Sequence, residues 1–301
     1  MQHGSRASKL CHSAVLNKQL TLEIHRYAKK PLAYIENDAV SCYDRIINPL
    51  VLLLLCILGL SSTTTASIAA TWEKTYHRIK YLYGVSSLSY TNHPEKLLYG
   101  PGQGSTIGPL LWLLCFLLIF HSLSTASPAI YLNSVDQTRP ITYISEAFVH
   151  DSGLGTNKTK ADLGDLISNL NILAQSWEKL LYSTGGALNL SKCFWFRLSW
   201  NWVGGKARLQ NIAATPGNIE MTSEGASDSV ISIPRIEPTA GFCTLGVYIY
   251  PSRSNQEAIR IIRSYALDYS TNIKGSYLTR QEALTSYIQY LLPKLRFQPP
   301  V

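Results

Sequence analysis

Charged residues are scarce in this chain. Only 15% of its 301 residues are Asp, Glu, Lys or Arg, and 46% are hydrophobic, whereas about a quarter of the residues of a typical soluble domain are charged. No charged residue occurs at 46–72 or at 97–135. This composition excludes a disordered, charge-rich segment, and the length is sufficient to bury the core of one large domain or two.

Cysteine pairs and a signal sequence are also missing. The six cysteines are scattered and form no C-x-x-C pair, so nothing indicates a zinc site or a disulfide framework. The first twenty residues contain no continuous apolar segment, which argues against a secretory signal. We therefore expect reduced thiols and an intracellular protein, nuclear or cytoplasmic, that is not secreted.

Acidic residues are the minority among the charges. Lys and Arg number 27 against 19 Asp and Glu, which gives a net charge of +8. Such a balance suits an anionic partner, either nucleic acid or an anionic membrane surface. The apolar runs 49–60 and 109–120 are shorter than the roughly 20 residues that a spanning helix needs. We expect core helices there, and the alternative is a membrane-inserted protein with apolar helices 49–66 and 109–127.

Hydrophobic periodicity predicts a mixture of helices and antiparallel hairpins, which is an α+β fold. Apolar residues at helical spacing predict helices over 68–83, 160–182 and 255–295, the last interrupted at 278–280. The first of these helices would carry a mostly basic face, which is more often solvated than bound to phosphates. Strands or hairpins are expected at 141–154, around the glycines at 204–205 and at 244–252, whereas 211–235 should be irregular.

Two acids lie in stretches that predict metal chemistry. Asp38 in YIENDAVSCYDRI follows a β-like run, and Asp151 in YISEAFVHDSGL lies at the expected turn of a hairpin. Nucleotidyl transfer by two metal ions needs carboxylates that meet in the fold although they are distant in the chain. With GPGQGSTIGPLLW, TGGALNLSKCFWF and TLGVYI in the same order, these stretches resemble the palm motifs of reverse transcriptases from non-long-terminal-repeat retroelements, from about Leu32 to Pro293.

The resemblance implies a role for each matching residue. Asp38 and Asp151 would be the metal ligands, with Phe148 as the aromatic residue of the second acidic motif. Tyr43 would lie under the sugar of the incoming nucleotide. The structural alternatives remain open: Asp38 could cap a following helix and Tyr43 could be a core aromatic.

Other matching residues would contact nucleic acid. Gln103 and Gly104 match the loop that holds template and nucleotide, where glycine permits close approach of the backbone. Lys192 matches the basic residue near the nucleotide phosphates, although a solvated lysine is an alternative. Leu245 and Gly246 match the turn that grips the primer. A phosphate loop is excluded as an explanation of the glycines at 100–104, because no Gly-Lys-Ser/Thr follows.

His150 departs from the family pattern. The family usually has aromatic-x-Asp-Asp, and Phe148-Val149-His150-Asp151 supplies only the second acid. Magnesium prefers oxygen ligands, and the change also removes a negative charge that would offset two divalent ions. We therefore expect a degenerate catalytic position with weak metal occupancy; a site for manganese or a softer ion is the alternative.

The resemblance implies a polymerase palm, an antiparallel sheet packed on helices, with residual fingers at 1–37, the palm at 38–230, and a primer-grip strand with a partial helical thumb at 231–301. An intact relative would use two Mg²⁺ or Mn²⁺ ions, an RNA template, a DNA primer and deoxynucleoside triphosphates. No obligate protein partner is indicated. The leading hypothesis is an RNA-directed DNA polymerase domain with impaired activity, and the alternative is an inactive nucleic-acid-binding remnant of a retroelement.

Overall fold

A four-stranded antiparallel sheet forms the centre of the molecule. The computed structural model describes residues 11–40, 42–91, 100–102, 105–126, 129–134, 138–143, 145–157, 163–222, 230–253 and 256–297. The strand order is β6-β7-β1-β8, with β1 (Leu32–Asp38) and β7 (Asp151–Thr156) inside, and β6 (Ser145–Phe148) and β8 (Phe194–Leu198) at the edges. The predicted mixture of helices and sheet is confirmed.

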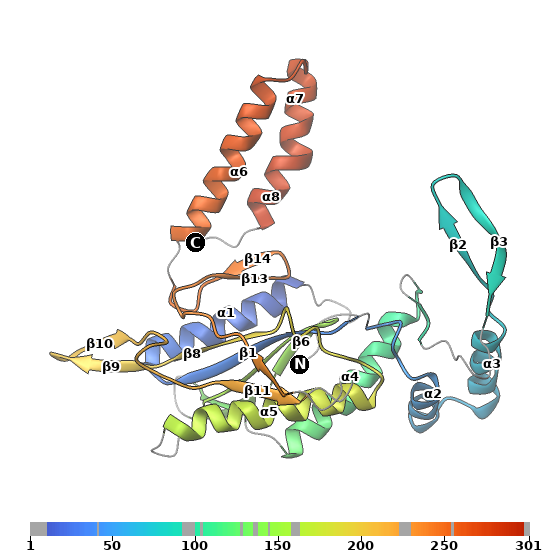
Figure 1. Ribbon diagram of the computed structural model, residues 1–301, viewed down its shortest axis with the longest axis horizontal. Helices are drawn as coiled ribbons and strands as arrows, with labels where there is room; N and C mark the ends of the chain where they lie inside the picture. Colours follow the sequence, from blue (N-terminus) through green and yellow to red (C-terminus); the bar gives the residue numbers. More distant parts are fainter. Residues whose placement is uncertain are drawn as a thin grey trace.

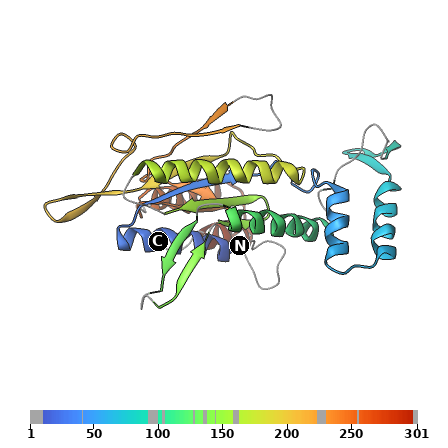
Figure 2. The same ribbon diagram turned by 90° about the horizontal axis from the view of Figure 1, so that it is seen from below.

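Both faces of the central strand β1 are buried. Because side chains alternate along a strand, Ala33 and Ile35 pack with α4 (Gly108–Ala126) and α5 (Leu163–Ser183), which cover one face (Figure 2). Leu32 and Tyr34 pack on the other face with α1 (Cys11–Ala28) and the hairpin of β13 (Phe242–Thr244) and β14 (Val247–Ile249). Two hydrophobic clusters therefore fix the position of β1.

The remaining elements pack around this core or project from it (Figure 1). They are α2 (Asn48–Ile57), α3 (Ser62–Glu73), β2 (His77–Tyr81), β3 (Gly84–Tyr90), β4 (Ile130–Asn133), β5 (Pro140–Tyr143), β9 (Trp200–Val203), β10 (Lys206–Leu209), β11 (Ile219–Thr222), β12 (Val230–Ile233), α6 (Gln256–Lys274), α7 (Arg280–Ser286), the π-helix η1 (Tyr287–Leu291) and α8 (Leu292–Phe297). The predicted hairpin around the glycines at 204–205 is confirmed as β9 and β10.

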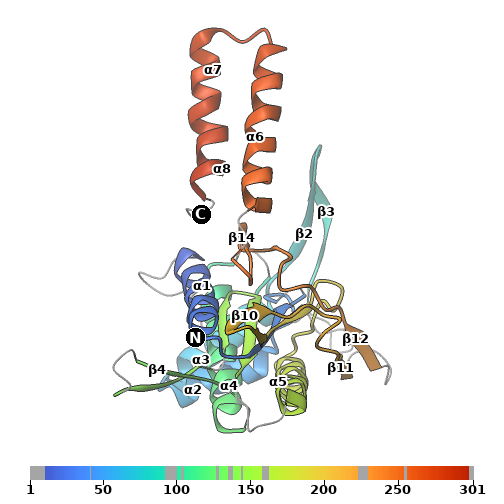
Figure 3. The ribbon, with the colours of Figure 1, turned by 90° about the vertical axis from the view of Figure 1, so that its left-hand side faces the viewer.

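The C-terminal helices form a hairpin that stands away from the sheet (Figures 1 and 3). The predicted interruption is confirmed: α6 ends at Lys274 and α7 begins at Arg280. Thr279 caps α7, since its hydroxyl accepts from the Glu282 amide while the Glu282 carboxylate accepts from the Thr279 amide. Such a capping box satisfies two backbone donors that a helix start would otherwise leave unpaired.

The helix predicted over 68–83 is wrong in its second half. The helix α3 ends at Glu73, and β2 and β3 then form an antiparallel hairpin. Residues 76–83 fit both a helical spacing and an alternation of period two, in which Ile79 and Tyr81 alternate with Arg78 and Lys80. The short β-branched and aromatic run favours the strand.

Two further expectations need correction. The stretch 211–235 is not wholly irregular, because β11 and β12 pair within it and Ile219 and Met221 are buried in the cluster that contains α5. The helix α4 is also longer than predicted, and Gly108–Thr125 is long and apolar enough to cross a membrane. Since 44% of that segment is buried inside the molecule, α4 also serves as a core helix.

Candidate metal and nucleotide site

Asp38 and Asp151 lie opposite each other on neighbouring strands. Asp38 ends β1, Asp151 begins β7, and the two are direct partners in the antiparallel register. His150 belongs to the two-residue loop between β6 and β7. One ligand atom from each of Asp38, His150 and Asp151 lies within 4.8 Å of the others. The expectation that the two distant acids meet on adjacent strands is confirmed.

The loop that carries His150 is held in a strained conformation. Val149 has φ 57°, a region that β-branched residues rarely occupy. The indole Nε1 of Trp112 on α4 donates a hydrogen bond of 2.6 Å to the Val149 carbonyl oxygen. This bond ties the loop to the core helix. This hydrogen bond cannot be predicted from the sequence, because Trp112 lies in an apolar run and is indistinguishable there from the other core residues.

Asp38 already has several partners within the protein. Its Oδ2 lies 3.0 Å from Nζ of Lys192 and 3.5 Å from Nδ2 of Asn189, and its Oδ1 lies 3.6 Å from Nε2 of His150. Asn189 was not among the predicted site residues, although it lies in the same short segment as Lys192. The alternative in which Asp38 caps a helix is wrong, since the next helix, α2, begins at Asn48 with Ile47 as its N-cap.

Most of the predicted site residues line one cleft of about 570 Å³. They are Asp38, Tyr43, Phe148, His150, Asp151, Lys192 and Leu245, from β1, the segment after it, the β6–β7 hairpin, the segment before β8 and the β13–β14 turn. Gly246 lines an adjoining cavity with Leu245. Gln103 and Gly104 lie outside the described residues. The roles assigned to all these residues stay predictions.

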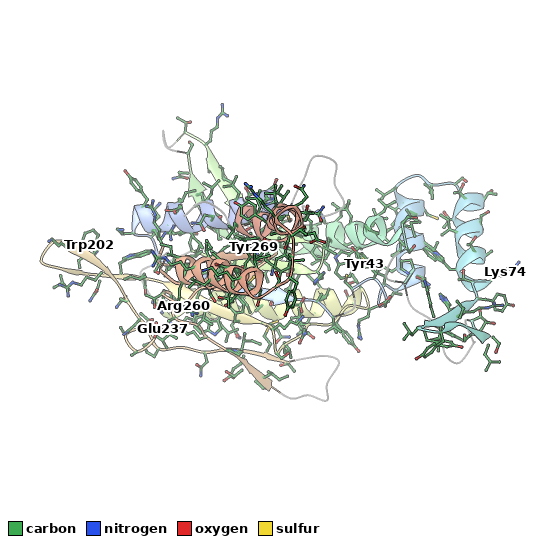
Figure 4. All side chains as sticks on the ribbon, turned by 90° about the horizontal axis from the view of Figure 1, so that it is seen from above. Tyr43, Lys74, Trp202, Glu237, Arg260 and Tyr269 are labelled. Atoms are coloured by element: carbon green, nitrogen blue, oxygen red, sulfur yellow. The ribbon has the colours of Figure 1, made fainter. Side chains whose placement is uncertain are left out.

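Tyr43 is half-buried at the wall of this cleft. Its ring makes an edge-to-face contact with Trp112, with ring centroids 6.5 Å apart, and Figure 4 labels it beside α4. The two readings of Tyr43 from the sequence are therefore compatible. One side of the ring packs on the core while the residue still borders the cleft.

Leu245 and Gly246 form a tight turn between β13 and β14. Their φ values are 53° and 79°, and two successive positive values are typical of a type I′ hairpin turn. Glycine adopts this conformation at little cost, whereas leucine does not. The turn brings Leu245 to the cleft while Thr244, just before it, is buried.

A buried cluster of charged residues lies beneath the acid pair. Nζ of Lys18 on α1 is 2.7 Å from a Glu36 carboxylate oxygen and 3.0 Å from the Thr244 hydroxyl. Glu36 lies two residues before Asp38 and therefore on the same face of β1. Lys18 thus connects α1, β1 and the β13–β14 turn. The signal in the sequence was a glutamate directly after the apolar run of β1, but its partners are too distant in the chain to identify.

A second buried carboxyl, that of Glu146, completes the cluster. Glu146 on β6 and Glu36 on β1 both lie opposite Gly153 of β7. Gly153 leaves no room for a side chain, because an added Cβ would lie 2.1 Å from the Tyr34 hydroxyl. The carboxyls of Glu36 and Glu146 and the ammonium group of Lys18 therefore form one buried cluster beneath Asp38 and Asp151.

Burial raises the pKa of three acids in this region. It is the main cause for Asp151, where His150 and Lys18 act in the opposite direction and Asp38 adds to the rise. Burial also raises the pKa of Glu36, against the effect of Lys18. The pKa of Glu146 rises to about 8, again mainly through burial and in spite of Lys18. A neutral Glu146 therefore leaves Lys18 to pair with Glu36.

We expect Glu146→Gln to remove part of the pH dependence of stability. The pKa of Glu146 is about 8 in the folded chain against an ordinary value of 4.5. Between these values the folded chain keeps a proton that the unfolded chain has lost, so the unfolding free energy falls as pH rises, by up to about 1.4 kcal/mol per pH unit. The variant lacks this effect. Measured by urea unfolding, its unfolding free energy should therefore rise relative to that of the wild type between about pH 5 and about pH 8. Parallel pH profiles of the two proteins would contradict this.

The donor set fits one divalent cation better than two magnesium ions. Asp38 and Asp151 offer carboxylate oxygens and His150 offers an imidazole nitrogen, so this cluster could hold a metal ion. Magnesium takes oxygen ligands in strict octahedral geometry, whereas manganese and zinc accept imidazole. A pair of magnesium ions would need a third carboxylate in place of His150. The residues present therefore do not fit the complete two-ion site.

Comparisons with known proteins give a partial structural likeness. No family model and no curated protein matches the sequence. The apo telomerase of Candida tropicalis, truncated from its C-terminal domain, is 15% identical with a TM-score of 0.43, and the match covers 68% of this chain and 37% of that one.

Telomerases of Candida albicans and Candida tropicalis, each in complex with the TWJ fragment of telomeric RNA, are 13% and 14% identical with TM-scores of 0.40. They match 100% and 97% of this chain, which spans 46% and 44% of theirs. The chain thus covers less than half the length of these telomerases. A likeness at this level assigns no activity, and the non-long-terminal-repeat type stays a prediction.

Proposed function

We propose that this chain is a reverse-transcriptase-like domain whose cleft binds a primer–template and a deoxynucleoside triphosphate, with nucleotidyl transfer impaired by His150. In this proposal 38–230 is the palm, 231–301 the primer grip and partial thumb, and 1–37 part of the fingers, except that the palm also includes the whole of β1, which begins at Leu32. The observation that carries it is the direct pairing of Asp38 with Asp151 at the end of two neighbouring strands. The ordered sequence motifs around these acids support the same conclusion.

The proposal assigns a binding role to each of the following residues of the cleft. Lys192 is exposed and carries a positive charge beside Asp38, so it would attract the nucleotide phosphates. Tyr43 would support the sugar, and the Leu245–Gly246 turn would hold the primer end. Asp38 and Asp151 would hold the cation, which when bound lowers the barrier by offsetting negative charge at the phosphates.

Primer extension on an RNA template tests the proposal directly. With Mg²⁺ or Mn²⁺, we expect the extension rate of the wild-type chain to stay within about tenfold of that of an Asp38→Asn control. Even an outer-shell change at a metal site costs about 10–100-fold in affinity or activity, and His150 stands at the position of a metal ligand. Salt-sensitive binding of a primer–template duplex should accompany this low activity. Robust synthesis by the wild type would refute the impairment, and failure to bind the duplex would refute the domain assignment.

A second candidate is a nucleic-acid-binding remnant without catalysis. The contacts of Asp38 favour it, because Lys192 and His150 already lie near both of its carboxylate oxygens. In that case Asp38→Asn should leave primer–template affinity unchanged with and without Mn²⁺. The first candidate instead predicts that Mn²⁺ tightens nucleotide binding by the wild type and not by the variant, which a titration with a fluorescent nucleotide would distinguish.

A further inference from the structure

The β2–β3 hairpin is an unusually exposed apolar and aromatic element. It rises from the same side of the molecule as the α6–α8 helices and stands free of the core (Figures 1 and 3). The side chains of Tyr76, Leu82 and Tyr83 are 71%, 88% and 89% exposed. Further exposed apolar or aromatic residues are Ile79, Tyr81, Val85, Leu88 and Tyr90. Contiguous exposed patches of this kind usually mark interaction sites, whereas single exposed apolar residues do not.

The hairpin is cationic as well as aromatic. Lys74, Arg78 and Lys80 are exposed, and no Asp or Glu occurs at 74–94. Lys74 lies at the end of the molecule opposite to Trp202 (Figure 4). An element with this charge attracts an anionic partner and repels a cationic one.

Aromatic and basic residues are interleaved along the hairpin. Neighbouring side chains point to opposite faces of a strand, so Tyr81 and Lys80 lie on different faces, and a shift of register between Arg78 and Lys80 interrupts the alternation there. His77 and Tyr90 are cross-strand partners whose rings stack 5.2 Å apart. The hairpin is only two strands wide, about 5 Å from strand to strand. The long basic side chains can therefore reach around its edge to a ligand that contacts the aromatic rings.

We propose that this hairpin binds an unpaired strand of nucleic acid, with bases stacked on Tyr81 and Tyr83 and phosphates near Arg78 and Lys80. Aromatic side chains combined with basic residues are the usual means of binding single strands without regard to sequence. The inference rests on the proposed function in one respect: the bound strand would be the unpaired continuation of a template held in the cleft. The hairpin and α6–α8 rise on the same side of the sheet (Figures 1 and 3), as such a path requires.

Binding of labelled oligonucleotides to the full chain tests the inference. Fluorescence anisotropy would compare an unpaired RNA strand, an unpaired DNA strand, a blunt duplex and a duplex with an unpaired template extension. We expect Tyr81→Ala/Tyr83→Ala to weaken binding of the unpaired strands about tenfold or more, because each stacked base contributes substantially to affinity. Binding of the blunt duplex should be unchanged, and comparison of RNA with DNA identifies the strand that is preferred.

Matched variants separate stacking from general hydrophobicity. Leu82→Ala/Leu88→Ala removes two exposed apolar side chains from the same hairpin and should leave strand affinity within about twofold, since it removes no aromatic ring. Tyr81→Trp/Tyr83→Trp should preserve or tighten binding. Arg78→Ala/Lys80→Ala should reduce the salt dependence, changing the slope of log affinity against log salt by about 1.4 if both contact phosphates.

Several outcomes would overturn the assignment. These are equal losses in the leucine and tyrosine variants, no loss in the tyrosine variant, or no binding of unpaired strands by the wild type. Binding of anionic phospholipid vesicles that depends on Leu82 and Leu88 would assign the hairpin to a membrane surface instead. Unchanged duplex binding in the same experiments would leave the proposed function standing while the inference about the hairpin fails.

Discussion

Under the proposed function, replacing His150 by aspartate should raise RNA-templated primer extension by about 100-fold or more, since the change adds a third carboxylate ligand and even outer-shell groups of metal sites contribute 10–100-fold. The new carboxylate would be in the same loop as His150, with Asp38 and Asp151 close by. It supplies the third oxygen donor and the negative charge that two magnesium ions need. Single-nucleotide incorporation with Mg²⁺ and with Mn²⁺ would measure the gain.

Two controls make this result specific. His150→Asn has a similar size to the aspartate variant but adds no charge, so its extension should stay at the wild-type level. His150→Asp/Asp38→Asn should return to background, because it again has only two carboxylates. Equal activity of the Asp and Asn variants at position 150 would show that a third carboxylate at this position does not limit the extension rate.

The aspartate variant should also depend more on metal for its stability. Three carboxylates close together repel one another, and Asp38 loses its contact with His150. We therefore expect the melting temperature of His150→Asp to rise more on addition of Mg²⁺ than that of the wild type. This readout does not depend on catalysis, so it reports on metal binding even if extension stays low.

Replacing Lys18 by methionine should destabilise the fold by about 3–5 kcal/mol, the usual effect of removing one partner of a buried ion pair. The side chains of Lys18 and Glu36 are only 3% and 8% exposed. Without Lys18, Glu36 stays buried beside a second carboxyl, that of Glu146, and the Thr244 hydroxyl loses its donor. Urea unfolding at pH 7 would measure the loss.

Two variants serve as controls for Lys18→Met. Lys18→Met/Glu36→Leu removes both charges and should recover most of the stability, because an apolar pair can replace a buried ion pair. Lys74→Met changes an exposed lysine and should alter stability by less than about 0.5 kcal/mol. A small effect of Lys18→Met alone would mean that water or another group compensates Glu36.

The sequence predicts the central acids better than their surroundings. The β-like run that ends at Asp38 and the hairpin around Asp151 are local patterns, and the order of the motifs indicates that the two acids meet. The Lys18–Glu36 pair could not be predicted, because α1 and β1 carry no local sign that their charged side chains face each other. The contact from Trp112 to Val149 likewise depends on the packing of α4 against a loop distant in the chain.

The error at 76–83 has a different origin. Local sequence there fits two periodicities, and no core contact decides between them because the hairpin is exposed. Where a segment packs on the core, as α5 does, the helical spacing predicts the element well. Where it does not pack, the pattern of Tyr, Ile and basic residues reflects something other than burial, and this is consistent with a surface that binds a ligand.

The burial of β1 on both faces affects how this site can change during evolution. A shift of the strand by one residue would exchange the two sets of core side chains, so selection for a stable fold alone keeps positions 38 and 151 opposite each other. The geometry of this strand pair can therefore persist whether or not the site is used, and a change at a single loop position could add a third carboxylate to a scaffold that the core already holds in place.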